Sequence, residues 1–294
     1  MQTRRSFIRT ASLLTAGAAF QPNAFGASRH AIGLQLYTVR DAMQKDVAST
    51  LARVAELGFS AVEGATYSGS QDFYGLKPSA FKALLRQHRL VMPSNHYRLG
   101  MEKPDEQEMQ GTLLHQWDKA VDDAAAVGIS YMVCAYLSPE ERGGIDGYKR
   151  LAEQLNRAGE RCRQAGILLC YHNHDFEFEP MDGLLPYDVL LSQTDSSLVK
   201  MELDLYWVHK AGKDPLALFA QHPGRFPLWH VKDMDNTPQK GFTEVGSGVI
   251  DFKSVFLKAR QAGMKHFFVE QDHTPASPFD SIRKSITYIK KNII

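Results

Sequence analysis

The sequence predicts an α/β protein built as a single (β/α)8 TIM barrel, and three observations lead to this fold class. Setting aside an N-terminal segment of 27 residues leaves 267 of the 294 residues, close to the roughly 250 of such barrels. Eight short apolar runs alternate with helical patterns along this length. Four of the helical patterns end at a glycine just before the next apolar run, as expected for a repeated strand and helix unit.

The eight apolar runs have the length and composition of buried parallel strands. Strands are expected at residues 32–37, 61–63, 90–95, 129–135, 167–172, 198–203, 226–231 and 265–270. A doubly wound open sheet is the structural alternative, but it requires neither an eighth strand nor polar residues at the strand ends. Because no linker rich in Pro, Gly or Ser interrupts the array, residues 28–294 are expected to form one domain.

Helices are expected between these strands, and glycines mark where four of them end. The helices are predicted at residues 47–57, 117–127, 148–165 and 252–262, and the glycines that follow them are Gly58, Gly128, Gly166 and Gly263. Glycine accepts the left-handed conformation that stops a helix. A long segment with three glycines, residues 235–250, is predicted to form a loop over the barrel mouth, and Asp233 is interpreted as a residue that orients this loop.

The first 27 residues have the features of an export signal. Arg4 and Arg5 precede Phe7 and Ile8, and residues 10–20 form an apolar stretch too short to cross a bilayer. The segment resembles the twin-arginine translocation motif, with cleavage expected after Ala27. A chance pair of arginines before an ordinary helix is the alternative. The resemblance implies a periplasmic protein that is exported folded and receives its metal in the cytoplasm.

Composition and charge narrow the class of partner. The chain has 34 Lys and Arg against 33 Asp and Glu, a net charge of +1, so no bulk field attracts nucleic acid or an anionic membrane. Cys134, Cys162 and Cys170 are odd in number and match no zinc motif, so they are interpreted as core thiols. We therefore expect a small-molecule partner, and no stable membrane association after signal cleavage.

Charged side chains at the carboxyl ends of the predicted strands point to a metal site. In a barrel these ends converge on one face, and His172, Asp204, His230 and Glu270 end strands five to eight in order. Two imidazoles and two carboxylates suit divalent Mn, Co, Zn or Fe better than Ca or Mg, which prefer oxygen ligands. A buried histidine bonded to a carbonyl is the simpler interpretation of any one of them, but not of all four together.

Several segments carry a resemblance to a known family. They are residues 32–37 (IGLQLY), 58–63 (GFSAVE), 171–174 (YHNH), 203–204 (LD), 230–233 (HVKD) and 269–270 (VE). They resemble the xylose isomerase-like TIM-barrel superfamily, which includes the sugar phosphate isomerase/epimerase family, and the likeness covers nearly all of the chain after the signal. The resemblance implies one divalent metal held by Glu, Asp, His and Glu, and homo-oligomers are common in the family.

The sequence departs from the family pattern at the first of these ligands, where His172 stands in place of glutamate. Ketose 3-epimerases use two metal-bound glutamates as an acid and base pair, and here only Glu270 remains a carboxylate. A symmetric epimerase is therefore disfavoured. Residues 171–178 (YHNHDFEF) look similar to the histidine-rich segments of inosose dehydratase and of lyases that act on 3-keto-glycosides.

Other polar residues near the strand ends are assigned roles in catalysis or sugar binding. The candidate catalytic residues are His174, Lys232, Glu270 and Glu63, and the candidate substrate-binding residues are Tyr37, His96, Tyr206, Trp207 and Arg40. His174 could act as acid or base near neutral pH, and Lys232 could stabilise an enolate or protonate a leaving group. A structural salt bridge for Lys232, hydrogen bonds for Glu63 and His96, and packing for the aromatic residues are the alternatives.

These features predict a metal-dependent enzyme that removes a proton next to the carbonyl of a keto-sugar, keto-glycoside or cyclitol through a metal-stabilised enediolate. We favour β-elimination, as in a 3-keto-glycoside 1,2-lyase or a dehydratase, with an isomerase or epimerase of a free sugar as the alternative. A phosphodiesterase like endonuclease IV is disfavoured by the net charge of +1. A non-catalytic periplasmic sugar-binding barrel is the alternative from another class.

Overall fold

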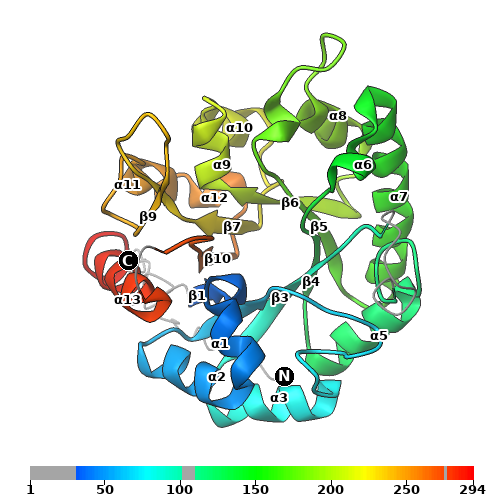
Figure 1. Ribbon diagram of the computed structural model, residues 1–294. Coiled ribbons are helices and arrows are strands. Elements are labelled where there is room, and N and C mark those ends of the chain that lie inside the picture. Colours follow the sequence, from blue (N-terminus) through cyan, green and yellow to red (C-terminus); the bar gives the residue numbers. More distant parts are fainter. Residues whose placement is uncertain (1–30, 101–109, 275–276) are drawn as a thin grey trace, which may run out of the picture.

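Eight parallel strands close into a barrel surrounded by helices (Figure 1). The computed structural model describes residues 31–100, 110–274 and 277–294, so the predicted export signal lies outside the described residues. The barrel strands are β1 (Ile32–Gln35), β2 (Ala61–Gly64), β3 (Val91–Tyr97), β4 (Tyr131–Cys134), β5 (Leu168–His172), β6 (Val199–Asp204), β7 (Leu228–Val231) and β10 (His266–Val269). Around the barrel their order is β1, β10, β7, β6, β5, β4, β3, β2.

The closure confirms the predicted barrel and excludes the open sheet, because β1 pairs in parallel with both β2 and β10. Gly33 lies opposite Ala61 on one side and Phe268 on the other. All eight strands lie where they were predicted, with small shifts at their ends. The first strand is two residues shorter than predicted, because the Gln35 side chain accepts a hydrogen bond from the Tyr37 amide and starts the 3-10 helix η1 (Leu36–Val39).

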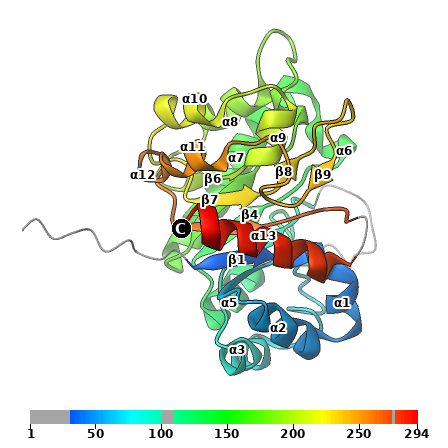
Figure 2. The same ribbon diagram turned by 90° about the vertical axis from the view of Figure 1, so that its left-hand side faces the viewer.

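Helices cover the outside of the barrel (Figure 2). The longer ones are α2 (Val47–Glu56), α3 (Pro78–Gln87), α5 (Trp117–Val127), α7 (Gly144–Gln164), α8 (Pro186–Gln193), α10 (Pro215–Gln221) and α13 (Pro278–Asn292). Shorter turns are α1 (Arg40–Lys45), α6 (Pro139–Arg142), α9 (Leu205–Lys210), α11 (Phe252–Phe256), α12 (Ala259–Ala262) and the 3-10 helix η2 (Phe176–Phe178). The helix predicted at residues 252–262 is therefore divided into α11 and α12.

The predicted glycine junctions are confirmed at all four places. Gly128 ends α5 with φ of 100°, a conformation that a side chain would disfavour, and its amide bonds to the Ala124 carbonyl. The glycines before β2, β5 and β10 also have positive φ. Each junction reverses the chain directly from a helix into the next strand.

The amino-terminal part of the barrel interior is apolar. Val133, Cys170, Leu228 and Phe268 pack there as a separate buried cluster. The next inward positions, two residues further along three of these strands, are His172, His230 and Glu270, because alternate residues of a strand face the same side. All three cysteines are free and buried, as predicted. Within the described residues no helix is both long and apolar enough to span a membrane.

The segment after β7 forms a small hairpin at the carboxyl end of the barrel. Its strands β8 (Asp233–Met234) and β9 (Phe242–Thr243) pair antiparallel. The buried Asp233 carboxylate accepts hydrogen bonds from the amides of Met234, Gly246, Gly248 and Ile250. The expectation that Asp233 orients this loop is therefore confirmed.

Candidate functional site

A cavity of about 750 Å³ opens at the carboxyl ends of the strands, the face at which TIM-barrel enzymes have their active sites. Seven of the residues singled out in the sequence line it: Tyr37, His96, His172, His174, Trp207, Lys232 and Glu270. The wall also includes further aromatic rings, among them Tyr136, Phe176 and Phe242. Polar groups at the bottom and aromatic rings at the sides are a common composition for small-molecule sites.

Five of the predicted site residues do not line this cavity: the fully buried metal candidates Asp204 and His230, and also Tyr206, Arg40 and Glu63. Tyr206 is 1% exposed, and its hydroxyl donates to the Lys240 carbonyl at 2.6 Å. The Arg40 guanidinium donates to the carbonyls of Tyr37 and Asp272, beside a separate depression. Glu63 is fully buried below the cavity floor. The direct sugar contacts that were expected of Tyr206 and Arg40 are therefore not supported by this geometry.

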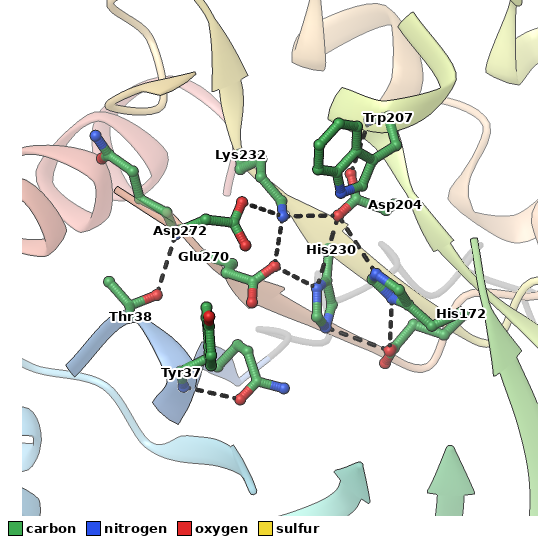
Figure 3. Close-up of polar contacts among 12 residues, drawn as sticks. Tyr37, Thr38, His172, Asp204, Trp207, His230, Lys232, Glu270 and Asp272 are labelled. Atoms are coloured by element: carbon green, nitrogen blue, oxygen red, sulfur yellow. Dashed lines mark hydrogen bonds and ion pairs between the residues drawn. The ribbon is translucent and has the colours of Figure 1, made fainter. Parts of the chain in front are cut away.

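The four predicted metal ligands lie close together (Figure 3); His172 and Glu270 line the cavity, and the fully buried Asp204 and His230 lie beside them. We call His172, Asp204, His230 and Glu270 the upper donor set. Asp204 Oδ2 lies 3.7 Å from His172 Nε2 and 3.8 Å from His230 Nδ1. His230 Nδ1 lies 2.8 Å from Glu270 Oε2. Strands five to eight thus bring their last inward side chains to one point, as predicted from the sequence.

Lys232 lies at the upper donor set and pairs with three carboxylates. Its Nζ lies 2.6 Å from Glu270 Oε2, 3.0 Å from Asp204 Oδ2 and 2.8 Å from Asp272 Oδ2 (Figure 3). Burial alone would lower the pKa of Lys232, but the three carboxylates outweigh it and raise the pKa well above its usual range. The ammonium group is therefore charged.

A second group of polar side chains lies one layer deeper in the barrel. We call Glu63, His96 and Glu202, with the deeper ring nitrogens of His172 and His230, the lower cluster. Glu202 Oε2 lies 2.8 Å from His96 Nε2, 3.0 Å from His172 Nδ1 and 3.3 Å from His230 Nε2. Glu63 Oε2 lies 2.5 Å from His230 Nε2. His172 and His230 therefore face one donor group with each of their two nitrogens.

Strand alternation explains this layering. Glu202 and Asp204 are two residues apart on β6, so both point into the barrel, one at each depth. Glu202 was not among the predicted site residues, because these were the last residues of each strand and those that follow them. Alternation along β6 identifies Glu202 from the sequence, because it lies two residues before Asp204, which was predicted from its place at the end of the strand.

Burial and neighbouring charge shift the pKa values of these carboxylates in opposite directions. Burial and the charge of Glu63 raise the pKa of Glu202 to about 7. Burial likewise raises the pKa of Asp204 to about 6, although Lys232 lies beside it. For Glu270 burial is outweighed by Lys232 and His230, which hold its pKa below the usual range.

His174 stands apart from the other histidines of the site. Burial, with a smaller effect of Lys232, lowers the pKa of His174 to about 3, so the ring is neutral at pH 7. Its Nδ1 is buried and has no hydrogen-bond partner among the residues that the structure describes. The ring stacks on Phe176 with an interplanar angle of 6° and lies 5.4 Å from the Trp207 ring. A neutral imidazole thus lines the cavity beside the upper donor set.

Two further carboxylates of the site were missed by the sequence analysis. Asp272, two residues after Glu270, pairs with Lys232. Glu177 is fully buried, where it accepts hydrogen bonds from the Tyr171 hydroxyl and the His174 amide, both at 2.7 Å. Both follow a predicted ligand within a few residues, but their contacts depend on how the chain turns after the strand.

The upper donor set fits a divalent metal by the chemistry of its donors. The donor atoms of Asp204, His230 and Glu270 lie within 4.8 Å of one another, and all three side chains are buried. Asp204 Oδ2 accepts no hydrogen bond from the described residues, although the Lys232 ammonium lies close to it. Two imidazoles and two carboxylates are a usual ligand combination for zinc and for its first-row neighbours.

Comparisons with known proteins agree with this geometry. An inosose dehydratase of Lacticaseibacillus casei is 28% identical over 163 residues, which are 49% of this chain and 54% of that protein. The chain thus spans about half the length of the curated relatives that it matches first. A sugar phosphate isomerase/epimerase structure from Parabacteroides distasonis has a TM-score of 0.78 with 28% identity, covering 91% of this chain and 96% of the other.

A further structural match extends the likeness in fold. The structure of the IolI protein, described with a bound zinc atom, has a TM-score of 0.67 at 14% identity, covering 88% of this chain and 96% of the other. At this identity the match shows the shared fold alone. The model of the family described as xylose isomerase-like TIM barrel matches residues 51–292. The chain therefore belongs to the xylose isomerase-like TIM barrel family.

Proposed function

We propose that this protein is a metal-dependent enzyme that removes a proton next to the carbonyl of a keto-sugar, keto-glycoside or cyclitol. One observation carries the proposal: the upper donor set, the neutral ring of His174 and the ammonium of Lys232 meet at the floor of one cavity. An electrophile, a proton acceptor and a proton donor are the three parts that this chemistry needs.

In this proposal, His172, Asp204, His230 and Glu270 hold one divalent ion of the Mn, Co, Zn or Fe type. When bound, such an ion polarises a substrate carbonyl and acidifies the neighbouring C–H bond. The zinc described for IolI belongs to that protein, and it supports the proposal only as a likeness in fold. The two carboxylates balance the charge of a divalent ion.

His174 is the proposed proton acceptor. Its ring lines the cavity and is neutral, so one of its two nitrogens keeps a basic lone pair, and no described residue is hydrogen-bonded to its buried Nδ1. The rings of Phe176 and Trp207 limit how the imidazole can turn. Glu270 and Glu63 were also predicted to take part in proton transfer. Glu63 lies below the cavity floor, and Glu270 is paired with Lys232 and His230.

Lys232 is the proposed donor to a developing oxygen anion or to a leaving oxygen. Asp204, Glu270 and Asp272 keep its amine protonated and fix its position at the cavity floor. A fixed ammonium lowers the energy of an oxygen that gains negative charge. Loss of a β-oxygen from the substrate would then complete an elimination, with the proton for that oxygen coming from Lys232.

We favour elimination over isomerisation because of two findings. His172 replaces the glutamate that would form the second half of a symmetric acid and base pair. The curated relatives matched first are dehydratases by name. The alternative, an isomerase or epimerase of a free sugar, is favoured by the name of the Parabacteroides distasonis structure, which shares 28% identity with this chain.

Proton NMR in D2O tests the proposal directly. The metal-loaded protein is mixed with 3-keto-glucosides, an inosose and common ketoses, and a chelated sample serves as control. We expect chelator-sensitive deuterium uptake at one carbon, with release of the aglycone or water if elimination follows. A new sugar without release would indicate an isomerase or epimerase. Absence of exchange with every compound, combined with sugar binding that survives chelation, would replace the proposal by a non-catalytic binding barrel.

A further inference from the structure

We propose that the lower cluster is a second site for a divalent cation, with His96, His172, His230 and Glu202 as its ligands. The donor atoms of these four residues lie within 4.8 Å of one another. The cation would be of the zinc or cobalt type, because three of the four donors are imidazole nitrogens. The inference stands on the geometry of the cluster and does not depend on the proposed reaction.

The spacing of the donors matches a small coordination shell. Three imidazole nitrogens surround Glu202 Oε2 at 2.8, 3.0 and 3.3 Å. Ligands bound tetrahedrally at about 2.0–2.1 Å lie roughly 3.3 Å apart. The side chains come from β3, β5, β6 and β7, so the barrel itself holds the donors in place. Donors fixed by strands give a site that is formed before the ion arrives.

Hydrogen bonding alone accounts poorly for this arrangement. A carboxylate offers about four acceptor positions spread over two oxygens. Here three nitrogens gather at Glu202 Oε2, whereas the buried Oε1 has no hydrogen-bond partner among the described residues. A buried polar atom without a partner is costly, and a group of donors converging on one point is typical of a cation position. The fully buried carboxylate of Glu63 adjoins the same point and supplies the second negative charge.

The two sites share two ligands, and this makes them alternatives. His172 and His230 each face the upper donor set with one nitrogen and the lower cluster with the other. A neutral imidazole binds an ion through one nitrogen and keeps a proton on the other, which then needs a carboxylate acceptor. With an ion in the lower cluster, the His230 Nδ1 proton goes to Glu270, 2.8 Å away. We therefore expect one ion per chain, in either position.

The lower cluster can be reached from outside. His96 and His172 both line the cavity, so an ion that enters the mouth meets two of the four ligands. His96 is the residue that distinguishes the two positions, since its Nε2 contacts Glu63 and Glu202 and none of the upper carboxylates. The experiment is built on this residue.

Cobalt titration of the metal-free full chain tests the inference, because Co²⁺ has a visible spectrum and shifts the NMR signals of ligand protons. The variant Asp204→Asn removes an oxygen that belongs to the upper donor set alone. We expect it to bind one equivalent of Co²⁺, with shifted imidazole signals from three histidines including His96. Adding His96→Asn or Glu202→Gln to this variant should weaken binding by more than 100-fold.

Glu177→Gln in the Asp204→Asn background is the matched control. It removes a fully buried carboxylate whose contacts are Tyr171 and the His174 amide, outside the lower cluster. Cobalt affinity should stay within a few-fold. The inference is overturned if Asp204→Asn alone abolishes binding, or if His96→Asn leaves the affinity of that variant unchanged and no His96 signal shifts. Circular dichroism of each variant confirms that it folds. If one of the lower-cluster variants His96→Asn and Glu202→Gln does not fold, the other still tests the inference.

Discussion

At the scale of single residues, His174 has three properties that no other histidine of the site has together. Its ring is neutral, it lines the cavity, and its buried Nδ1 has no hydrogen-bond partner among the described residues. His172 and His230 use both ring nitrogens within the two donor groups. Chain position alone does not separate these roles, because His172 and His174 have the same parity after β5.

We therefore expect His174→Gln to reduce deuterium exchange into an accepted substrate by about 100-fold or more, since a positioned general base contributes on the order of 10² to 10⁴. Metal content should not change. His222→Gln, which alters a ring at the end of α10 and outside the cavity lining, serves as control. Full exchange activity in His174→Gln, measured by NMR, would assign proton abstraction to another residue.

The buried carboxyl group of Glu177 is expected to make the free energy of unfolding depend on pH. Burial raises its pKa from 4.5 to about 7, so the folded state holds a proton that the unfolded chain releases near pH 4.5. This contribution to stability is complete below about pH 4.5 and is lost as the pH rises towards 7. Glu177→Gln, which stays neutral, should gain stability relative to the natural protein over that range, by about 3 kcal/mol.

Urea unfolding of both proteins at pH 5 and pH 7.5 measures this difference. The comparison between the two proteins cancels the other titrating groups, which they share. A difference in the free energy of unfolding that stays constant, or shrinks, as the pH rises would show that Glu177 titrates at an ordinary value in the folded state.

At the scale of elements, site residues on the strands could be predicted from the sequence, whereas site residues beyond the strands could not. The upper donor set could be predicted because its members end strands five to eight. Glu202 can be identified in the same way, because it lies two residues before Asp204 on β6 and faces the same side. Tyr206 and Arg40 could not be placed in this way. They lie in α9 and α1, beyond the strands, where a contact such as Tyr206 with the Lys240 carbonyl joins segments that are distant in sequence.

The hairpin after β7 is expected to depend on the Asp233 side chain for its order. Asp233 holds it through four backbone amides, so Asp233→Ala should destabilise the protein by at least about 2 kcal/mol and loosen the segment from 235 to 250. Trypsin should then cut at the exposed Lys240 several-fold faster. Asp214→Ala, which removes an exposed helix cap, should leave this cleavage unchanged. Equal cleavage rates in both variants would contradict the anchoring role.

At the scale of the whole molecule, the barrel could be predicted because it repeats one local unit. Apolar runs typical of buried strands and glycines at helix ends can be recognised over short stretches of sequence. Repetition of this strand and helix unit predicts a barrel. The division of residues 252–262 into α11 and α12, and the early end of β1 at Gln35, depend on local hydrogen bonds that periodicity does not reveal. The lower cluster was not predicted from the sequence, because its donors come from separate strands that meet only in the closed barrel.

Closure of the barrel around its donors links metal binding to global stability. The proposed ligands come from separate strands and meet only in the folded chain, so a bound ion is expected to stabilise that state by mass action. At a free concentration 100 times the dissociation constant, this amounts to about 2.7 kcal/mol, and Tm should rise by roughly 5–10 °C. Differential scanning calorimetry with Co²⁺, Mn²⁺ or Zn²⁺ and then a chelator measures the shift. A Tm that none of the three ions alters would contradict a metal site.

The anchoring of the β8–β9 hairpin has a consequence for how this protein could evolve. Phe242 of the hairpin lines the cavity and packs 4.4 Å from the Tyr206 ring, while Asp233 fixes the chain on either side of it. Residues 235–241 can therefore lengthen, shorten or change without moving β7, which carries His230. Evolution could therefore reshape this side of the cavity by changing one short surface loop, while the upper donor set keeps its place.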